Sequence, residues 1–417
     1  MRNGPFLWIL ILIMILIDLY IFFSVRSLFV SGSKSRYIYS IVYWIFSLLA
    51  LTAMIAMPHL RLMEQHKLLK STVFVLVFAL FMGKLIAALF FFIDDLRRSV
   101  QWVAGKLFSP GNEISEIAGT TGNSISRSSF LTWLGMISGG SMFASFVYGL
   151  SNKYNYQLKR VRIPFSNLPE AFKGLKIVQI SDIHCGSFTN TSAVNRGIDM
   201  ILAQNPDIIL FTGDLVNNKC DEVGDYRQLF SRLKAPMGVY SILGNHDYGD
   251  YAEWSSQAEK AQNLETLKKI HAEMGWRLLL DEHVPLQKDD AVIGLVGVQN
   301  ISGRGRFHSY GSMEKAMQGT QSYPFKILMS HDPSHWDTEV STQYPDINLT
   351  LSGHTHGMQF GVEIPGFRWS PVQYVYRHWA GLYEQQGQKL YVNRGFGFIG
   401  YPGRVGILPE ITVIELA

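Results

Sequence analysis

The stretch LKIVQISDIHCG, residues 175–186, joins an apolar run to a short polar cluster. Residues 175–181 (LKIVQIS) have the length and composition of a buried strand. Asp182 and His184 follow this strand directly. A carboxylate and an imidazole in that position are typical of a sheet that holds its functional groups at the carboxyl ends of its strands.

The segments that follow repeat this arrangement. Residues 207–213 (DIILFTG) and 238–244 (GVYSILG) predict two further strands, and residues 191–204 and 223–233 predict helices between the strands. Alternating strands and helices favour parallel pairing with right-handed crossovers. We therefore expect residues 155–417 to form an α/β domain.

Potential ligands stand at five predicted strand ends, with glycines beside them. They are Asp182 and His184; Asp214; Asn245, His246 and Asp247; His331, after the apolar run 325–330 (FKILMS); and His354 and His356, after the run 347–353 (INLTLSG). A single histidine after a strand is more often a hydrogen-bonded structural residue. Five such strand ends in one domain indicate a shared site at one edge of the sheet.

The donor types indicate which ions such a site would bind. Carboxylate, amide oxygen and imidazole together suit Mn, Fe or Zn better than Mg or Ca, which prefer oxygen ligands. Without His246 and Asp247, seven ligands remain, which are too many for one ion and suit two ions that share a carboxylate, for which Asp214 is the candidate bridge. Two metals ~3.5–4 Å apart clamp a phosphate and lower the pKa of a bridging water, which gives a hydroxide for in-line attack on phosphorus. His246 is a candidate general acid for the leaving group.

The order of these motifs resembles the calcineurin-like metallophosphoesterases, and more narrowly their membrane-attached bacterial branch. The resemblance rests on D-I-H at 182–184, G-D at 213–214, G-N-H-D at 244–247, S-H-D-P at 330–333 and G-H-T-H-G at 353–357, and it covers about residues 155–417. It implies a four-layer α/β/β/α sandwich with a dinuclear site at the sheet edges.

The same resemblance implies a role for each site residue. Asp182, His184 and His356 would hold the first metal, Asn245, His331 and His354 the second, and Asp214 would lie between the two. His246 would contact the phosphate or protonate the leaving group, and Asp247 would orient His246.

Residues 1–151 carry most of the chain's apolar excess. Residues 5–25, 37–60, 71–93 and 128–151 are each long enough for a helix that crosses a ~30 Å hydrocarbon core, which takes ~20 residues. Two alternatives are a cleaved signal peptide at 5–25, whose apolar run is long for that role, and a buried soluble helix at 128–151, which contains several glycines.

Two ionisable residues lie inside the predicted spans. Asp18 and Lys84 stand at equal depth in the first and third spans, which run in the same direction, so we expect an ion pair between these helices. The alternative is that each side chain reaches separately toward the interface or a polar cavity. After the third span, residues 94–108 (DDLRRSVQWVAGKLF) have the spacing of a helix lying on the membrane surface, and residues 109–129 have the composition of a loop.

Lysines and arginines between the spans bear on orientation. The connections 26–36 and 94–127 carry seven of them, whereas residues 61–70 carry three and the N-terminus carries Arg2 alone. This distribution places the catalytic domain outside the cytoplasm, although the four cations at 153, 159, 160 and 162 would reverse the count if included. The segment SRSSFLT (126–132) resembles a twin-arginine export motif, with Ser128 in place of the second arginine.

Several features bear on the substrate. Arg304, Arg306 and Arg404 are candidate phosphate contacts, each with a structural role as the alternative. The aromatic segment 365–383 is expected either to face an amphiphilic substrate or the bilayer, or to pack in the core. A net charge of +4 gives no reason to expect a nucleic-acid partner, and the two cysteines exclude a disulfide framework.

We therefore expect a hydrolase of lipid-linked or membrane-proximal phosphodiesters or pyrophosphates. The family's cleavage of the UDP-diacylglucosamine pyrophosphate bond in lipid A synthesis is one alternative, and it would need a cytoplasmic site. A membrane scaffold or sensor with a secondary hydrolase domain is another.

Overall fold

The computed structural model describes residues 4–57, 66–108 and 127–417, which form two compact units, Met1–Tyr148 and Gly149–Ala417. Residues 109–126 of the expected loop, the first residue of the SRSSFLT segment and residues 58–60 of the second predicted span lie outside the described residues.

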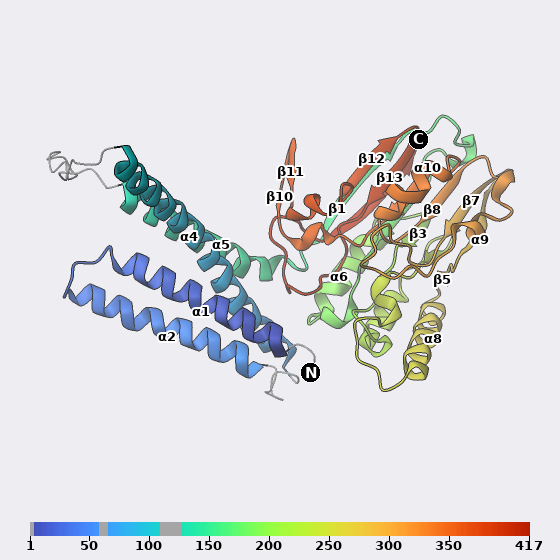
Figure 1. Ribbon diagram of the computed structural model, residues 1–417. Helices are drawn as coiled ribbons and strands as arrows, with labels where there is room; N and C mark the ends of the chain where they lie inside the picture. Colours follow the sequence, from blue (N-terminus) through green and yellow to red (C-terminus); the bar gives the residue numbers. More distant parts are fainter. Residues whose placement is uncertain (1–3, 58–65, 109–126) are drawn as a thin grey trace. The chain divides into compact units, whose positions relative to one another are not determined.

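The first unit contains four helices that are long and apolar enough to cross a membrane. They are α1 (Gly4–Arg26), α2 (Lys34–Ala56), α4 (Lys67–Phe108) and α5 (Arg127–Asn152). The helix expected at 94–108 is confirmed, but it is not a separate surface helix, because these residues continue the third span in one helix of 42 residues (Figure 1). The segment contains no proline and a single glycine, Gly105, and Asp94 pairs with Arg97 and Arg98 at helical spacing, which keeps the chain helical beyond the apolar part.

The glycines of α5 allow its backbone to approach α4 closely. A side-chain carbon at Gly139 would clash with the backbone oxygen of Gly83, and one at Gly83 would clash with the backbone oxygen of Gly139. Gly135 meets Ala87 and Phe91 one turn away. Pairs of small residues four positions apart are a common way for membrane helices to pack, so these glycines fit a membrane helix.

The predicted ion pair between the first and third spans is confirmed. Lys84 Nζ contacts Asp18 Oδ1, and the same oxygen accepts hydrogen bonds from Tyr43 Oη at 2.9 Å and Ser47 Oγ at 3.0 Å. Asp18 is 2% exposed, so its charge is satisfied inside the helix bundle.

The second unit is built on two mixed six-stranded sheets. The first has the order β1-β14-β2-β3-β4-β5 and consists of β1 (Gln157–Ile163), β14 (Glu410–Leu416), β2 (Lys176–Ile180), β3 (Ile208–Phe211), β4 (Val239–Ser241) and β5 (Arg277–Leu278). The second has the order β12-β13-β9-β8-β7-β6 and consists of β12 (Gly381–Gln385), β13 (Gln388–Val392), β9 (Leu349–Ser352), β8 (Lys326–Met329), β7 (Ala291–Gly297) and β6 (Glu282–Lys288). Strands β2 to β5 are parallel, as are β7, β8, β9 and β13.

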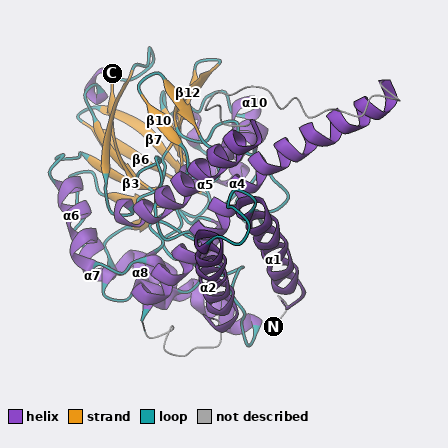
Figure 2. Ribbon diagram, turned by 90° about the vertical axis from the view of Figure 1, so that its left-hand side faces the viewer, coloured by secondary structure: helices purple, strands orange, loops and turns teal. Residues whose placement is uncertain are grey.

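Three hydrophobic clusters separate four layers. Helices α6 (Thr191–Leu202), α7 (Tyr226–Phe230) and α8 (Gln257–Glu273) cover one face of the first sheet, where Ile198 and Phe230 pack against Val178 and Phe211 (Figure 2). A second cluster, which includes Ile177 and Ile327, fills the space between the sheets. The third lies between the second sheet and a layer formed by α9 (Met313–Met317), a π-helical turn (Trp336–Val340) and α10 (Ser341–Gln343). The predicted four-layer α/β/β/α sandwich is confirmed.

The five strands predicted to carry ligands are all present, as β2, β3, β4, β8 and β9. The helix predicted at 223–233 is only partly correct, because the chain forms a 3-10 turn at Cys220–Val223 and then the short α7. Gly224, with φ +43°, separates the two pieces. A small two-stranded hairpin, β10 (Val362–Ile364) and β11 (Phe367–Trp369), stands apart from both sheets.

Candidate dinuclear metal centre

The carboxyl ends of β2, β3 and β4 from one sheet and of β8 and β9 from the other lead into one cluster of polar side chains. Two groups of side chains lie close enough to hold a metal ion: Asp182, His184 and His356, and Asp214, His331 and His354. Within each group the ligand atoms lie within 4.8 Å of one another.

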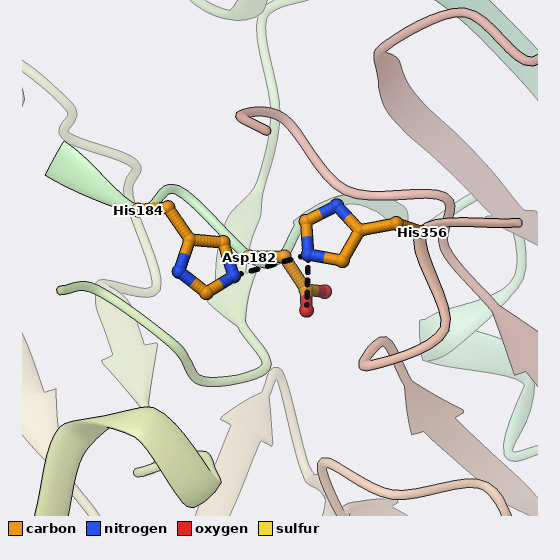
Figure 3. Close-up of side chains that lie close together, drawn as sticks. All are labelled: Asp182, His184 and His356. Atoms are coloured by element: carbon orange, nitrogen blue, oxygen red, sulfur yellow. Dashed lines mark hydrogen bonds and ion pairs between the residues drawn. The ribbon is translucent and has the colours of Figure 1, made fainter. Parts of the chain in front are cut away.

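The first group is drawn in Figure 3, where the Asp182 carboxylate and the His184 imidazole, which follow β2, lie close to the His356 imidazole from a distant segment. His184 Nε2 lies 3.0 Å from His356 Nε2, which in turn lies 3.3 Å from Asp182 Oδ1. Asp182 and His184 are fully buried and His356 is 5% exposed. Nε2 of His184 is the nitrogen turned to the cluster, and its Nδ1 has no hydrogen-bond partner among the described residues.

The second group includes Asn245 as well as the predicted histidines. Asn245 Oδ1 lies 2.8 Å from His354 Nδ1 and 3.2 Å from His331 Nε2, and these two nitrogens are 3.2 Å apart. Asn245 donates from Nδ2 to Tyr251 Oη at 2.9 Å, which turns its oxygen toward the histidines.

Asp214 lies between the two groups. Its Oδ2 is 3.2 Å from His331 Nε2 of the second group and 3.6 Å from His184 Nε2 of the first. Its other oxygen, Oδ1, accepts the backbone N–H of His246 at 2.8 Å. This is the position that a carboxylate shared by two ions would take.

The distances and donor types fit metal ions. Ligands about 2.0–2.2 Å from a first-row ion lie about 3–3.5 Å from one another in tetrahedral or octahedral geometry, the range in which these atoms meet. Nδ1 of His331 lies 2.8 Å from the carbonyl oxygen of Thr212, which can only accept, so this nitrogen carries the hydrogen. In a neutral His331, Nε2 then has a lone pair that faces two further acceptors, Asn245 Oδ1 and Asp214 Oδ2. A cation or a proton must therefore lie between this nitrogen and the two oxygens.

The pKa values agree with this arrangement. Burial lowers the pKa of His184 to about 3, which keeps this imidazole neutral, the form that binds a metal. Burial disfavours a charged His331, but the Asp214 carboxylate outweighs it and raises the pKa of His331 to about 10. Without a metal, His331 Nε2 therefore carries a proton that points at the acceptors around it, and metal binding would displace this proton.

The backbone at the site is strained. Asp182, His184, Asp214, His354 and His356 all have positive φ, between 50° and 72°. Non-glycine residues rarely adopt this conformation, which costs about 1–3 kcal/mol each and is concentrated at functional sites.

Two motif glycines let these turns approach one another. A side-chain carbon at Gly244 would clash with the Asp214 carboxylate, and one at Gly353 would clash with Ser181 and the Asp182 carboxylate. Both positions therefore require glycine if the ligands are to converge.

The structure assigns a different role to Asp247 from the one expected. Its carboxylate accepts the backbone N–H groups of Gly244, Asp214, Leu215 and Val216 at 2.8–3.2 Å, and it does not bond the His246 ring. The His246 ring is held instead by the carbonyl of Asn217, 2.7 Å from its Nδ1. The expectation that Asp247 orients His246 is therefore wrong, because backbone amides use both of its oxygens.

A cleft of about 970 Å³ opens onto the two groups. His246, Arg304 and Arg306 line it, together with Tyr251 and Arg377. Two buried side chains hold the arginine-bearing loop in place: Asp332 accepts from Ser302 Oγ at 2.6 Å, and Ser334 Oγ accepts the N–H of Gly303 at 3.0 Å.

Arg404 does not line this cleft. It is fully buried and donates to the backbone carbonyls of Arg394 at 2.8 Å and Gly395 at 3.2 Å, while its Nη2 lies 3.2 Å from His356 Nδ1. The expected phosphate contact at Arg404 is therefore corrected to a structural role behind His356.

Sequence reasoning missed two tyrosines that hold ligands. Tyr251 fixes the amide of Asn245, and Tyr376 Oη lies 2.8 Å from Nε2 of His354. Tyr251 could have been found only from its position six residues after Asn245 of the G-N-H-D motif. Tyr376 lies in the aromatic segment, where no motif marks it.

Comparisons with known proteins agree with the fold and the site. Residues 175–358 match the family described as "Calcineurin-like phosphoesterase", and residues 1–153 match "Probable Calcineurin-like phosphoesterase, transmembrane domain". The chain is 32% identical over 277 residues to the Danio rerio "Transmembrane protein with metallophosphoesterase domain", covering 65% of this chain and 60% of that protein. It is 29% identical over 310 residues to the "Uncharacterized metallophosphoesterase YkuE" of Bacillus subtilis (strain 168), covering 70% of this chain and 98% of that protein.

Among solved structures, a Thermus sulfate thiohydrolase, SoxB, is similar with a TM-score of 0.35 and 10% identity, over 60% of this chain and 57% of that one. The two family matches span the membrane unit and the part of the second unit that contains all the ligand-bearing strand ends, from Asp182 to His356. Residues 175–358 therefore form a calcineurin-like phosphoesterase domain, which follows the transmembrane domain described for such phosphoesterases.

Proposed function

We propose that this protein is a membrane-anchored phosphoester hydrolase that uses two metal ions. The observation that carries the proposal is the pair of buried ligand groups with the Asp214 carboxylate between them. Asp182, His184 and His356 would hold one ion, Asn245, His331 and His354 the other, and Asp214 would contact both. Mn, Fe or Zn would suit these ligands. When bound, such a pair supplies electrostatic stabilisation of a phosphate and activation of water.

The side chains around the ligands supply the remaining functions. His246 lines the cleft, and the bond from its Nδ1 to a carbonyl leaves Nε2 free to deliver a proton to a leaving-group oxygen. Arg304, Arg306 and Arg377 give the same cleft cations that suit phosphate oxygens.

Assay of the full chain in detergent, stripped of metal and then reloaded, tests the proposal. We expect hydrolysis of a soluble phosphodiester to disappear with chelation and to return with Mn, Fe or Zn. His246→Asn should lose most of the activity while keeping both ions. Full activity in the stripped protein, or binding of fewer than two ions, would contradict the proposal.

A lipid-linked or membrane-proximal substrate is the finer proposal. Val375 lines the cleft and is 47% exposed, and the neighbouring Tyr374, 77% exposed, accepts at its hydroxyl from Trp369 Nε1 of the β10–β11 hairpin at 3.5 Å. The same hairpin carries Phe367, 54% exposed, paired with Ile364, 59% exposed. An apolar rim next to a cation-lined cleft suits a substrate with a phosphate and a hydrocarbon part.

Not all of the aromatic segment 365–383 takes part in this surface. Trp379, 4% exposed, packs with Val372 and Tyr376 in a small core, so for this residue the core-packing alternative holds.

Lipid selection is tested with the double variant Phe367→Ser with Ile364→Ser, and Tyr374→Phe is a control that keeps its ring. We expect the double variant to lose activity on a diacylglycerol phosphoester in mixed micelles but to keep it on a soluble diester. Equal loss on both substrates would count against lipid selection.

The side of the membrane is a further proposal. The cations of the loops support an extracytoplasmic catalytic domain, which would argue against the UDP-diacylglucosamine reaction. Labelling of a cysteine placed at exposed Lys269 by an impermeant reagent in intact cells tests this proposal. Absence of labelling until the cells are lysed would favour a cytoplasmic site and return that reaction to consideration.

A further inference from the structure

A basic cleft lies at the end of the membrane unit where α1 passes into α2. It has a volume of about 730 Å³, and Arg26, Lys34 and Arg36 line it together with Ser31 and Ser33. None of these residues belongs to the proposed metal centre, and the cleft is formed within the first unit.

The three cations of this cleft have no carboxylate partner in the described part of the chain. The acidic residues described in the membrane unit are used elsewhere: Asp18 pairs with Lys84, Asp94 with Arg97 and Arg98, and Asp95 with Arg98. The Nε atoms of Arg26 and Arg36 are buried and have no hydrogen-bond partner among the described residues. Buried donors without a partner cost free energy, so an anion in this cleft would stabilise them.

The backbone adds to this positive potential. Helix α2, of 23 residues, begins at the cleft, and Ser33 caps it by accepting the N–H of Arg36 at 3.2 Å. The first N–H groups of a helix and the positive end of its dipole favour an anion at that end.

An apolar groove adjoins the basic cleft. This groove has a volume of about 560 Å³, and Val42, Phe46 and Leu80 line it, with Ile38 shared between the groove and the cleft. It runs between α2 and α4, two of the helices apolar enough to span a membrane. A cation-lined cleft that continues into such a groove matches a molecule with an anionic head and a hydrocarbon tail.

We propose that this end of the membrane unit binds an anionic membrane lipid. The phosphate of the headgroup would lie among Arg26, Lys34 and Arg36, with an acyl chain in the groove along α2. Basic pockets next to spanning helices bind anionic headgroups in this way. The groove favours a lipid over free phosphate, which would use the cleft alone.

Lipid retention by the full chain tests the proposal. The protein is purified in detergent, mixed with phosphatidylglycerol or phosphatidylcholine, and examined by native mass spectrometry and by thermal unfolding. We expect retained phosphatidylglycerol and a raised Tm, with little effect of phosphatidylcholine. Arg26→Gln with Arg36→Gln should weaken the phosphatidylglycerol effect about 10- to 30-fold.

Three controls distinguish the explanations. Lys67→Gln with Lys70→Gln removes two cations at the start of α4, outside the cleft, and should leave lipid retention unchanged. Arg26→Lys with Arg36→Lys should restore most of it. Hydrolysis of a soluble phosphodiester reports that each variant is folded and should be unaffected, so failure here is separate from failure of the proposed enzyme.

Two results would overturn the proposal. One is equal loss of lipid from the cleft variant and the α4 variant, which would mean that the cations act only through general attraction to the membrane surface. The other is an equal rise in Tm with inorganic phosphate, which would mean that the cleft binds a free anion and the groove contributes nothing.

Discussion

The two units of this protein each bury a cluster of polar groups, and the clusters are satisfied in opposite ways. In the membrane unit, Asp18 Oδ1 meets only donors: the ammonium of Lys84 and the hydroxyls of Tyr43 and Ser47. In the catalytic unit, acceptors meet acceptors, as where Nε2 of a neutral His331 faces the amide oxygen of Asn245 and the carboxylate of Asp214. The first cluster is complete as the chain makes it, whereas the second needs a cation or protons from outside.

This difference separates a structural ion pair from a metal centre. Both kinds of cluster are buried, and both contain charged groups, so burial alone does not distinguish them. The direction of hydrogen bonding distinguishes them, because metal ligands offer lone pairs, and in a metal centre no hydrogen-bond donor of the protein occupies those lone pairs. Changes to the metal centre should therefore affect activity, and changes to the ion pair should affect stability.

Asp214→Ala should have the largest effect. It removes the carboxylate between the two ligand groups and leaves His331 and His184 without their shared partner. We expect hydrolysis to fall by more than the roughly 10–100-fold that loss of an outer-sphere residue causes. The measurement is kcat on a soluble phosphodiester together with metal content, and an unchanged kcat with two ions bound would exclude a bridging role.

Loss of either histidine of the G-H-T-H-G motif should remove a different ion. His354 Nδ1 lies with Asn245 and His331, whereas His356 Nε2 lies with Asp182 and His184. The wild type is first loaded with two different metals that occupy distinguishable sites. Metal analysis of His354→Ala and His356→Ala, loaded in the same way, then shows which metal each variant has lost. Loss of the same ion from both variants would contradict the division into two sites.

Substitution of the membrane ion pair should lower stability without changing activity. Lys84→Met leaves the Asp18 charge buried and should destabilise the membrane unit by about 3–5 kcal/mol. Asp18→Asn combined with Lys84→Met should cost less than the sum of the single changes, because no charge is then left unpaired. Thermal unfolding in detergent measures the cycle, and additive effects would mean that the two side chains act independently.

The smallest effect concerns His271, a buried histidine that belongs to neither cluster. Its Nδ1 lies 3.0 Å from Ser241 Oγ, and burial lowers its pKa from 6.5 to about 3. The unfolded chain therefore takes up a proton below pH 6.5 that the folded chain refuses, so this residue destabilises the fold as the pH falls from 6.5 toward 3, by at most about 1.4 kcal/mol per pH unit. Tm at pH 7.5 and 5.5 should fall more for the wild type than for His271→Asn. An equal fall in the two proteins would show that another group is responsible.

Motifs at strand ends were predictable because parallel strands bring their carboxyl ends to one edge whatever the loops do. The ligand-bearing strands could therefore be placed from short apolar runs, each followed by a polar residue. Asp18 and Lys84 were predictable for a similar reason, since two helices of known direction fix the depth of each residue. The role of Asp247 was not predictable, because the backbone amides that its carboxylate accepts come together only when the turns at 214–216 and 244 fold against each other.

The sequence by itself determined the parallel α/β strands, the four apolar spans and the residues that gather at the proposed metal centre, because apolar runs and the polar residues after them are local properties of the chain. Its resemblance to a known family implied the four-layer sandwich. Only the tertiary structure decided how these residues face one another. It turned Asn245 toward His331 and His354 through Tyr251, buried Arg404 behind His356, and continued α4 through residues 94–108. It also joined a basic cleft at the start of α2 to an apolar groove along α4. These outcomes depend on contacts between distant segments, which residue spacing along the chain does not encode.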